Sequence, residues 1–116
     1  MTPSVTDRLG HIHAAITNID AAMEGQSRES FTNNIVLRMA VERLLEIISE
    51  ASRHLPAELK SHAPDINWRR LADLGNWLRH AYHRTDALLL WEMAASDLPP
   101  MKAFTEQALK EAKRPF

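Results

Sequence analysis

The chain has 116 residues, the length of one domain, of which 45% are hydrophobic and 25% are charged. Its 14 basic and 15 acidic residues nearly cancel, so any RNA binding would need a local basic patch. The sequence contains no cysteine, which excludes disulfides, thiol catalysis and thiolate metal sites. Because it has neither an apolar run of about 18 residues nor an N-terminal signal pattern, we expect a cytoplasmic protein without membrane contact.

The first half of the chain predicts two long helices. Residues 1–5 are expected to be frayed, Thr6 or Asp7 is expected to cap the first helix, and Gly25 is expected to end it. A second helix is predicted to begin after Ser27 and to run to about residue 54. It has a broad apolar face and a charged face rich in Arg and Glu.

The stretch 68–86, WRRLADLGNWLRHAYHRTD, is expected to carry the functional surface. Short elements connect it to the preceding helix: Pro56 ends that helix, PAELK favours a single helical turn, and HAPDIN reads as a loop. Within the stretch, apolar residues three and four apart predict one buried face, and polar residues form the opposite face. The buried set is Leu71, Leu74, Leu78 and Tyr82, and the outward set is Asn76, Arg79, His80 and His83.

The C-terminal third predicts two more helices. Thr85 or Asp86 can cap a short apolar helix, DALLLWEMAA, and residues 97–100 are expected to open the last helix. No segment alternates with period two, so the chain is predicted to be an all-α antiparallel bundle of four to five main helices in a single domain, residues 1–116, with residues 113–116 frayed.

Two patterns have metal-ligand spacing, but we favour non-metal interpretations of both. His80 and His83 are three residues apart without a third ligand nearby in sequence. Glu46 and Glu50 are four apart without the Glu-x-x-His pattern typical of two-metal bundles, which favours a charge network in solvent or between subunits. The sequence therefore predicts no metal site and no cofactor.

The segments VERLLEIISEASRHLPAELK and WRRLADLGNWLRHAYHRTD…LLLWEMAASDLPPMKAF resemble, in order and over residues 9–109, the HepT-like toxins of the HEPN superfamily. The resemblance implies a helical, metal-independent endoribonuclease that forms a homodimer with a shared cleft. Its expected partner is a minimal nucleotidyltransferase antitoxin that in some systems adenylylates the motif tyrosine. Membrane and DNA partners are not expected.

The family motif is Arg-Asn-x-x-x-His-x-Tyr. The sequence matches it at Asn76, His80 and Tyr82 and departs from it at Gly75, where the family has arginine. The resemblance implies that His80 is the acid–base residue, that Asn76 positions the substrate and that Tyr82 is the site of modification. Arg79 lies one helical turn after Gly75 and could replace the missing arginine at the phosphate. Further basic residues proposed for RNA binding are Arg70, His83 and Arg84.

Three interpretations remain open from the sequence. The first is an RNA-cleaving toxin. The second is a catalytically inactive helical partner of a nucleotidyltransferase, which binds a nucleotide or presents Tyr82 and which explains Gly75 without compensation. The third is a helical dimer whose polar stripe is structural.

Overall fold

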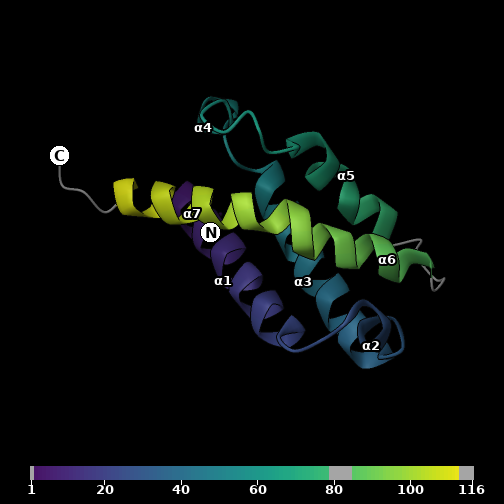
Figure 1. The fold of residues 1–116 in the computed structure, drawn as a ribbon. Coiled ribbons are helices and arrows are strands. Elements are labelled where there is room, and N and C mark those ends of the chain that lie inside the picture. Colours follow the sequence, from purple (N-terminus) through teal and green to yellow (C-terminus); the bar gives the residue numbers. More distant parts are fainter. Residues whose placement is uncertain (1, 79–84, 113–116) are drawn as a thin grey trace.

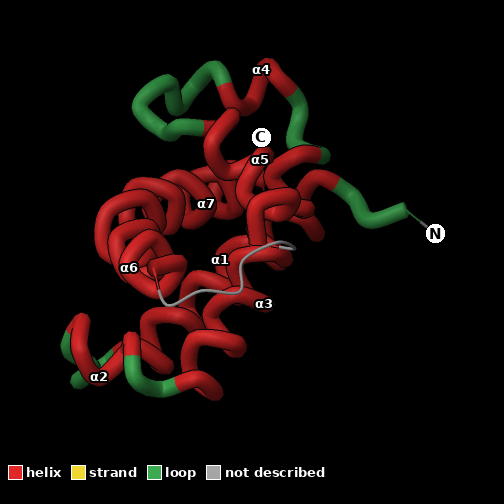
Figure 2. The backbone as a smooth tube through the Cα atoms, turned by 90° about the vertical axis from the view of Figure 1, so that its right-hand side faces the viewer, coloured by secondary structure: helices red, strands yellow, loops and turns green. Residues whose placement is uncertain are grey.

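The computed structural model describes residues 2–78 and 85–112, and these residues form an all-helical bundle. Figure 2 shows helices joined by loops, with α2 and α4 at opposite ends. The long helices are α1 (Val5–Met23), α3 (Ile35–Arg53), α5 (Trp68–Leu78), α6 (Thr85–Glu92) and α7 (Leu98–Ala112). Short helices α2 (Arg28–Thr32) and α4 (Ala57–Lys60) and a π-helical turn, η1 (Met93–Asp97), complete the described part. The all-α prediction is confirmed.

The core is a continuous apolar cluster between the long helices. α1 packs against α3 and α7, and α3 packs against α5 on another side (Figure 1). Residues at helical spacing supply the cluster, as the sequence pattern predicts: Leu9, Ile12, Ile16 and Ile19 of α1; Val41, Leu45 and Ile48 of α3; Leu71, Leu74 and Leu78 of α5; and Leu90, Met93, Leu98 and Met101 of the C-terminal helices. In the described ranges, every helix is too short or too polar to cross a lipid bilayer.

The first helix begins earlier than predicted. Ser4, not Thr6 or Asp7, is the N-cap: Asp7 N donates to Ser4 Oγ, and Ser4 N donates to the Asp7 carboxylate, each at 3.0 Å. This reciprocal capping box places Val5 inside the helix, so the expected fraying of residue 5 is wrong. The helix ends at Met23, and Gly25 has a φ of 76°, the left-handed conformation that glycine adopts without strain.

The single helix predicted for residues 27–54 is also wrong, because the chain breaks at Asn33 and Asn34. Asn33 closes α2, and the Asn34 side chain accepts a hydrogen bond of 3.0 Å from Leu37 N at the start of α3. Asparagine side chains compete for backbone groups and therefore favour helix ends. The break lets α2 pack against α6, where the rings of Phe31 and Trp91 lie 5.8 Å apart.

The two C-terminal helices are continuous rather than separate. In Figure 1, α6 and α7 form one long rod, joined by η1, where Leu98 N donates to Met93 O five residues back. Pro99 and Pro100 lack an N–H and would clash with carbonyls four residues back in a regular α-helix. A widened π-turn directly before them is consistent with this constraint.

Candidate active site

α5 positions Asn76, one of the predicted site residues. The Asn67 side chain accepts from Arg70 N at 3.0 Å and caps the helix, while buried Leu71, Leu74 and Leu78 anchor one face. The opposite face carries Asn76, which is exposed, as the sequence predicted. The described part of α5 runs to Leu78.

Apart from Arg70, the remaining predicted site residues lie on the segment 79–84. Arg79, His80, Tyr82, His83 and Arg84 lie outside the described residues, so their predicted roles stay predictions.

Arg70 and Asn76 lie on different sides of α5. Arg70 Nε lies 3.3 Å from Asp97 Oδ2 at the end of η1. This oxygen is buried and makes no hydrogen bond among the described residues, so the ion pair is its polar contact. Asn76 instead lines a hollow shared with Arg53 of α3. The structure therefore does not bring Arg70 and Asn76 together.

At Gly75, the backbone of α5 makes a polar contact with α3. Gly75 N donates to Ser49 Oγ at 3.2 Å, and Ser49 Oγ donates to Ala72 O at 3.3 Å. A Cβ built on Gly75 would lie 3.1 Å from Ser49 Oγ, closer than ordinary van der Waals contact. The glycine thus has a packing reason that the sequence did not reveal: its missing side chain leaves space for the Ser49 hydroxyl.

Two polar hollows lie along this α3–α5 contact. The Gly75 hollow has a volume of about 220 Å³ and is lined by Arg43, Glu46, Ser49, Glu50, Arg53 and Gly75. The Asn76 hollow has a volume of about 180 Å³ and is lined by Arg53, Ala72, Asp73 and Asn76. Arg53 lines both. Sequence reasoning assigned it only to a charged helix face, since nothing local in the sequence links it to Asn76.

The charged face of α3 forms the expected network. Arg43 Nη1 lies 3.2 Å from Glu46 Oε2. Glu50 contacts both His54 Nε2, at 3.0 Å, and Arg53 Nη1, at 3.8 Å. The hydrogen bond with His54 is the main cause that lowers the pKa of Glu50, and the charges of His54 and Arg53 add to it. Both glutamates are therefore engaged in ion pairs, as the charge-network interpretation predicted.

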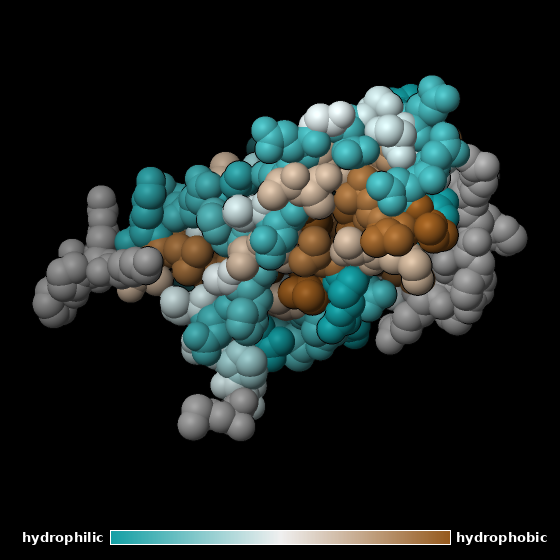
Figure 3. Space-filling model, turned by 90° about the horizontal axis from the view of Figure 1, so that it is seen from below, coloured by the Kyte–Doolittle hydropathy of each residue, from teal (hydrophilic) through white to brown (hydrophobic). Residues whose placement is uncertain are grey.

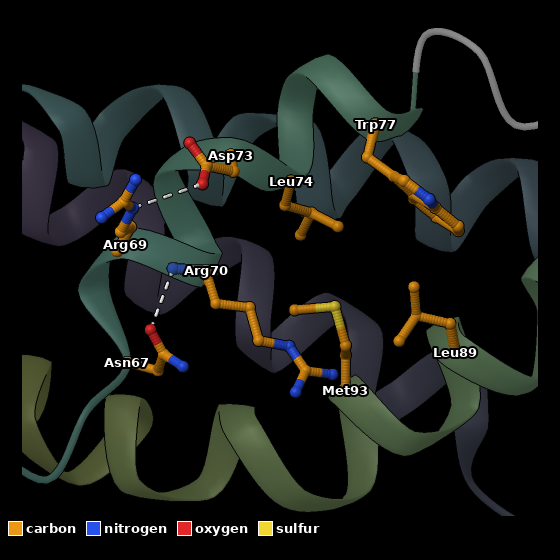
Figure 4. A pocket seen from close by; sticks show the side chains of 8 residues that line it. All are labelled: Asn67, Arg69, Arg70, Asp73, Leu74, Trp77, Leu89 and Met93. Carbon is orange, nitrogen blue, oxygen red and sulfur yellow. Dashed lines mark hydrogen bonds and ion pairs between the residues drawn. The ribbon is translucent and has the colours of Figure 1, made fainter.

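On the opposite side of α5 lies a larger pocket of about 420 Å³, which we call the Trp77 pocket (Figure 4). Leu74, Leu89 and Met93 give it apolar walls, and the Trp77 ring, 37% exposed, lies at one end. The basic residues Arg69 and Arg70 lie at the other end, where Arg69 Nε is 3.9 Å from Asp73 Oδ2. An exposed indole beside apolar walls and arginines can stack a planar ring such as a nucleobase.

Comparison with known proteins identifies the family. Residues 12–108 match the family model described as "Ribonuclease HepT-like". The chain belongs to this family. The match includes α3, α5 and the segment that carries the predicted motif, and it agrees with the extent of the resemblance seen in the sequence.

Three named relatives are similar to the chain over most of its length. A Thermococcus cleftensis protein named "Probable ribonuclease HepT" is 36% identical over 95% of this chain and 100% of its own length. A Methanocaldococcus jannaschii "Putative RNase" is 40% identical over 66% of this chain and 70% of its own length. A Caldanaerobacter subterraneus subsp. tengcongensis "Putative RNase" is 29% identical over 90% of this chain and 94% of its own length. No solved structure matches the chain.

Proposed function

We propose that this member of the HepT-like family is an endoribonuclease that acts as the toxin of a toxin–antitoxin pair in the cytoplasm. The observation that carries the proposal is the family match over residues 12–108, which spans the complete segment Asn76–Tyr82. The names of the relatives, which refer to ribonuclease or RNase, support the same reaction class.

The proposed chemistry needs neither metal nor cofactor. His80 acts as the acid–base residue: a base removes the proton of a ribose 2′-hydroxyl, the 2′-oxygen attacks the adjacent phosphorus, and an acid protonates the leaving 5′-oxygen. Imidazole suits both proton transfers near neutral pH. Asn76, exposed on α5, positions the substrate, and Arg79 stabilises the negative charge on the phosphate.

His83 and Arg84 are proposed as further RNA contacts. Arg70 is a weaker candidate, because its guanidinium is paired with Asp97 on the other side of α5 from Asn76.

The proposed partners are a second copy of the chain and a minimal nucleotidyltransferase antitoxin. A homodimer would bring two His80 residues to one cleft. Large apolar side chains available for an interface include Ile35, Val36 and Met39 at the start of α3, which are 57%, 74% and 61% exposed. Figure 3 shows apolar side chains gathered toward the right-hand side of one face of the molecule. The antitoxin is proposed to adenylylate Tyr82, whose hydroxyl would attack the α-phosphorus of ATP and release pyrophosphate.

The packing at Gly75 favours one alternative: a catalytically inactive helical partner of the nucleotidyltransferase. Position 75 faces Ser49, and an arginine there would need both the Ser49 hydroxyl and its hydrogen bonds to move. A chain adapted to glycine at this position can keep its fold and partner surface without cleaving RNA.

Cleavage of transfer RNA by the purified protein separates the two functions. We expect the wild-type protein to cleave, His80→Ala to be inactive, and His62→Ala, which removes an exposed histidine before α5, to match wild type. Equal activity in the wild-type protein and His80→Ala would contradict the proposed role of His80. Absence of cleavage by the wild-type protein would favour the inactive partner.

A further inference from the structure

One charged residue, Arg53, is shared by the two hollows that Gly75 and Asn76 of α5 line. It comes from the last turn of α3, and it lines both the Gly75 hollow and the Asn76 hollow. Gly75 contributes only backbone to the first hollow, and the Arg53 side chain forms part of its wall. Asn76, an exposed residue, lines the second hollow with it.

The Arg53 guanidinium is held only loosely by its neighbours. It forms an ion pair with Glu50 at 3.8 Å, which is longer than a hydrogen bond, and its side chain is 52% exposed. Glu50 is closer to His54, at 3.0 Å. By contrast, Arg43 in the same hollow lies 3.2 Å from Glu46. Of these two arginines, Arg53 is therefore the one whose donors can turn toward a ligand at little cost.

The acidic residue that lines the Asn76 hollow is Asp73, whose carboxylate lies 3.9 Å from Arg69 Nε, a pair about as long as that between Arg53 and Glu50. Among the described residues that line this hollow, Arg53 carries the cationic side chain, so it is the donor that an incoming anion would meet. A guanidinium is suited to the oxygens of a phosphodiester, because the arginine fork matches two of them.

We propose that Arg53 of α3 binds a phosphate of the RNA substrate beside Asn76. This inference rests on the proposed ribonuclease function and adds a substrate contact from a second helix. Asn76 and His80 belong to the same predicted motif, so on the proposed function a phosphate held beside Asn76 is part of the RNA bound by that motif. Arg53 positions the RNA and takes no part in proton transfer.

RNA binding tests this assignment without requiring turnover. The probe is a fluorescein-labelled 12-nucleotide 2′-O-methyl RNA, which lacks the attacking 2′-hydroxyl, and Kd is measured by anisotropy at several salt concentrations. We expect Arg53→Ala to raise Kd about tenfold and to reduce the slope of log K against log salt by about 0.7, the value for one lost phosphate contact with a single strand. Arg53→Lys should retain the slope, because it retains the charge.

The matched control is Arg28→Ala, which removes the same charge from an exposed position on α2. An Arg53→Ala slope equal to that of wild type, or an equal loss in Arg28→Ala, would overturn the assignment. The two proposals fail differently. If the wild-type protein cleaves transfer RNA and Arg53→Ala still binds the probe like Arg28→Ala, only the Arg53 assignment fails. If wild type neither cleaves transfer RNA nor binds the probe, the proposed function fails, and the assignment fails with it.

Discussion

Replacement of Gly75 by alanine tests whether the contact between α5 and α3 sets the residue at this position. In an unobstructed helix, Gly→Ala stabilises by about 1 kcal/mol. Here the new Cβ would lie 3.1 Å from Ser49 Oγ; Ser49 is 1% exposed, and its hydroxyl makes two hydrogen bonds with α5. Displacing it costs about 1–3 kcal/mol. Gly75→Ala should therefore be neutral or destabilising by up to about 2 kcal/mol.

A Ser49→Ala background reverses the expected sign. Only the Ser49 Cβ then remains, 3.7 Å from the new methyl group, which is ordinary contact. Gly75→Ala should now stabilise by about 1 kcal/mol, so the double-mutant cycle has a coupling of about 1–3 kcal/mol. Urea unfolding measures it, and in a domain of this size 1 kcal/mol corresponds to about 4 °C in Tm. Equal effects of Gly75→Ala in both backgrounds would refute the packing argument.

Three further predictions concern caps and ion pairs. Asn34→Ala should destabilise the protein by about 1 kcal/mol, visible as a lower urea midpoint, because it removes the cap of α3; an unchanged midpoint would contradict that role. Arg70→Ala should lower Tm by a few degrees, because it leaves the buried Asp97 oxygen unpaired. If Arg70→Ala lowers Tm by the same amount in an Asp97→Asn background, the ion pair is not the cause. The hydrogen bond with His54 lowers the pKa of Glu50 in the folded protein. The ionised Glu50 side chain therefore stabilises the fold above the pKa of an unfolded glutamate, and this stabilisation is lost as pH falls below about 4. The stability difference between wild type and Glu50→Gln should therefore shrink over that range, and a constant difference would contradict the assignment.

Helical periodicity in the sequence predicted most of the fold. The spacing of Leu71, Leu74 and Leu78 identified the buried face of α5, and Gly25 marked the end of α1. These signals are local, because each depends on residues within one or two turns. The errors also have local causes: the charged and apolar pattern of α3 masked the Asn33–Asn34 break, and two prolines suggested a new helix where the chain widens into a π-turn.

The candidate site depends more on contacts that are distant in sequence. The exposure of Asn76 followed from the helical pattern, but the proximity of Gly75 to Ser49 joins residues 26 apart. The same holds for Arg53 and Asn76, which meet only because α3 packs against α5. One sequence shows neither contact, since the register between two helices is set by how their side chains interlock. The roles of His80 and Tyr82 come from the family resemblance and remain predictions.

The most direct test of the central claim is to incubate transfer RNA with purified protein in EDTA and to identify the ends of the products. Attack by the 2′-hydroxyl leaves a 2′,3′-cyclic phosphate on one fragment and a 5′-hydroxyl on the other, whereas attack by water at phosphorus need not. We predict these ends for the wild-type protein and for His62→Ala, with no cleavage by His80→Ala. Products that carry 5′-phosphates, cleavage that EDTA abolishes, or cleavage that survives His80→Ala would contradict a metal-independent reaction centred on His80.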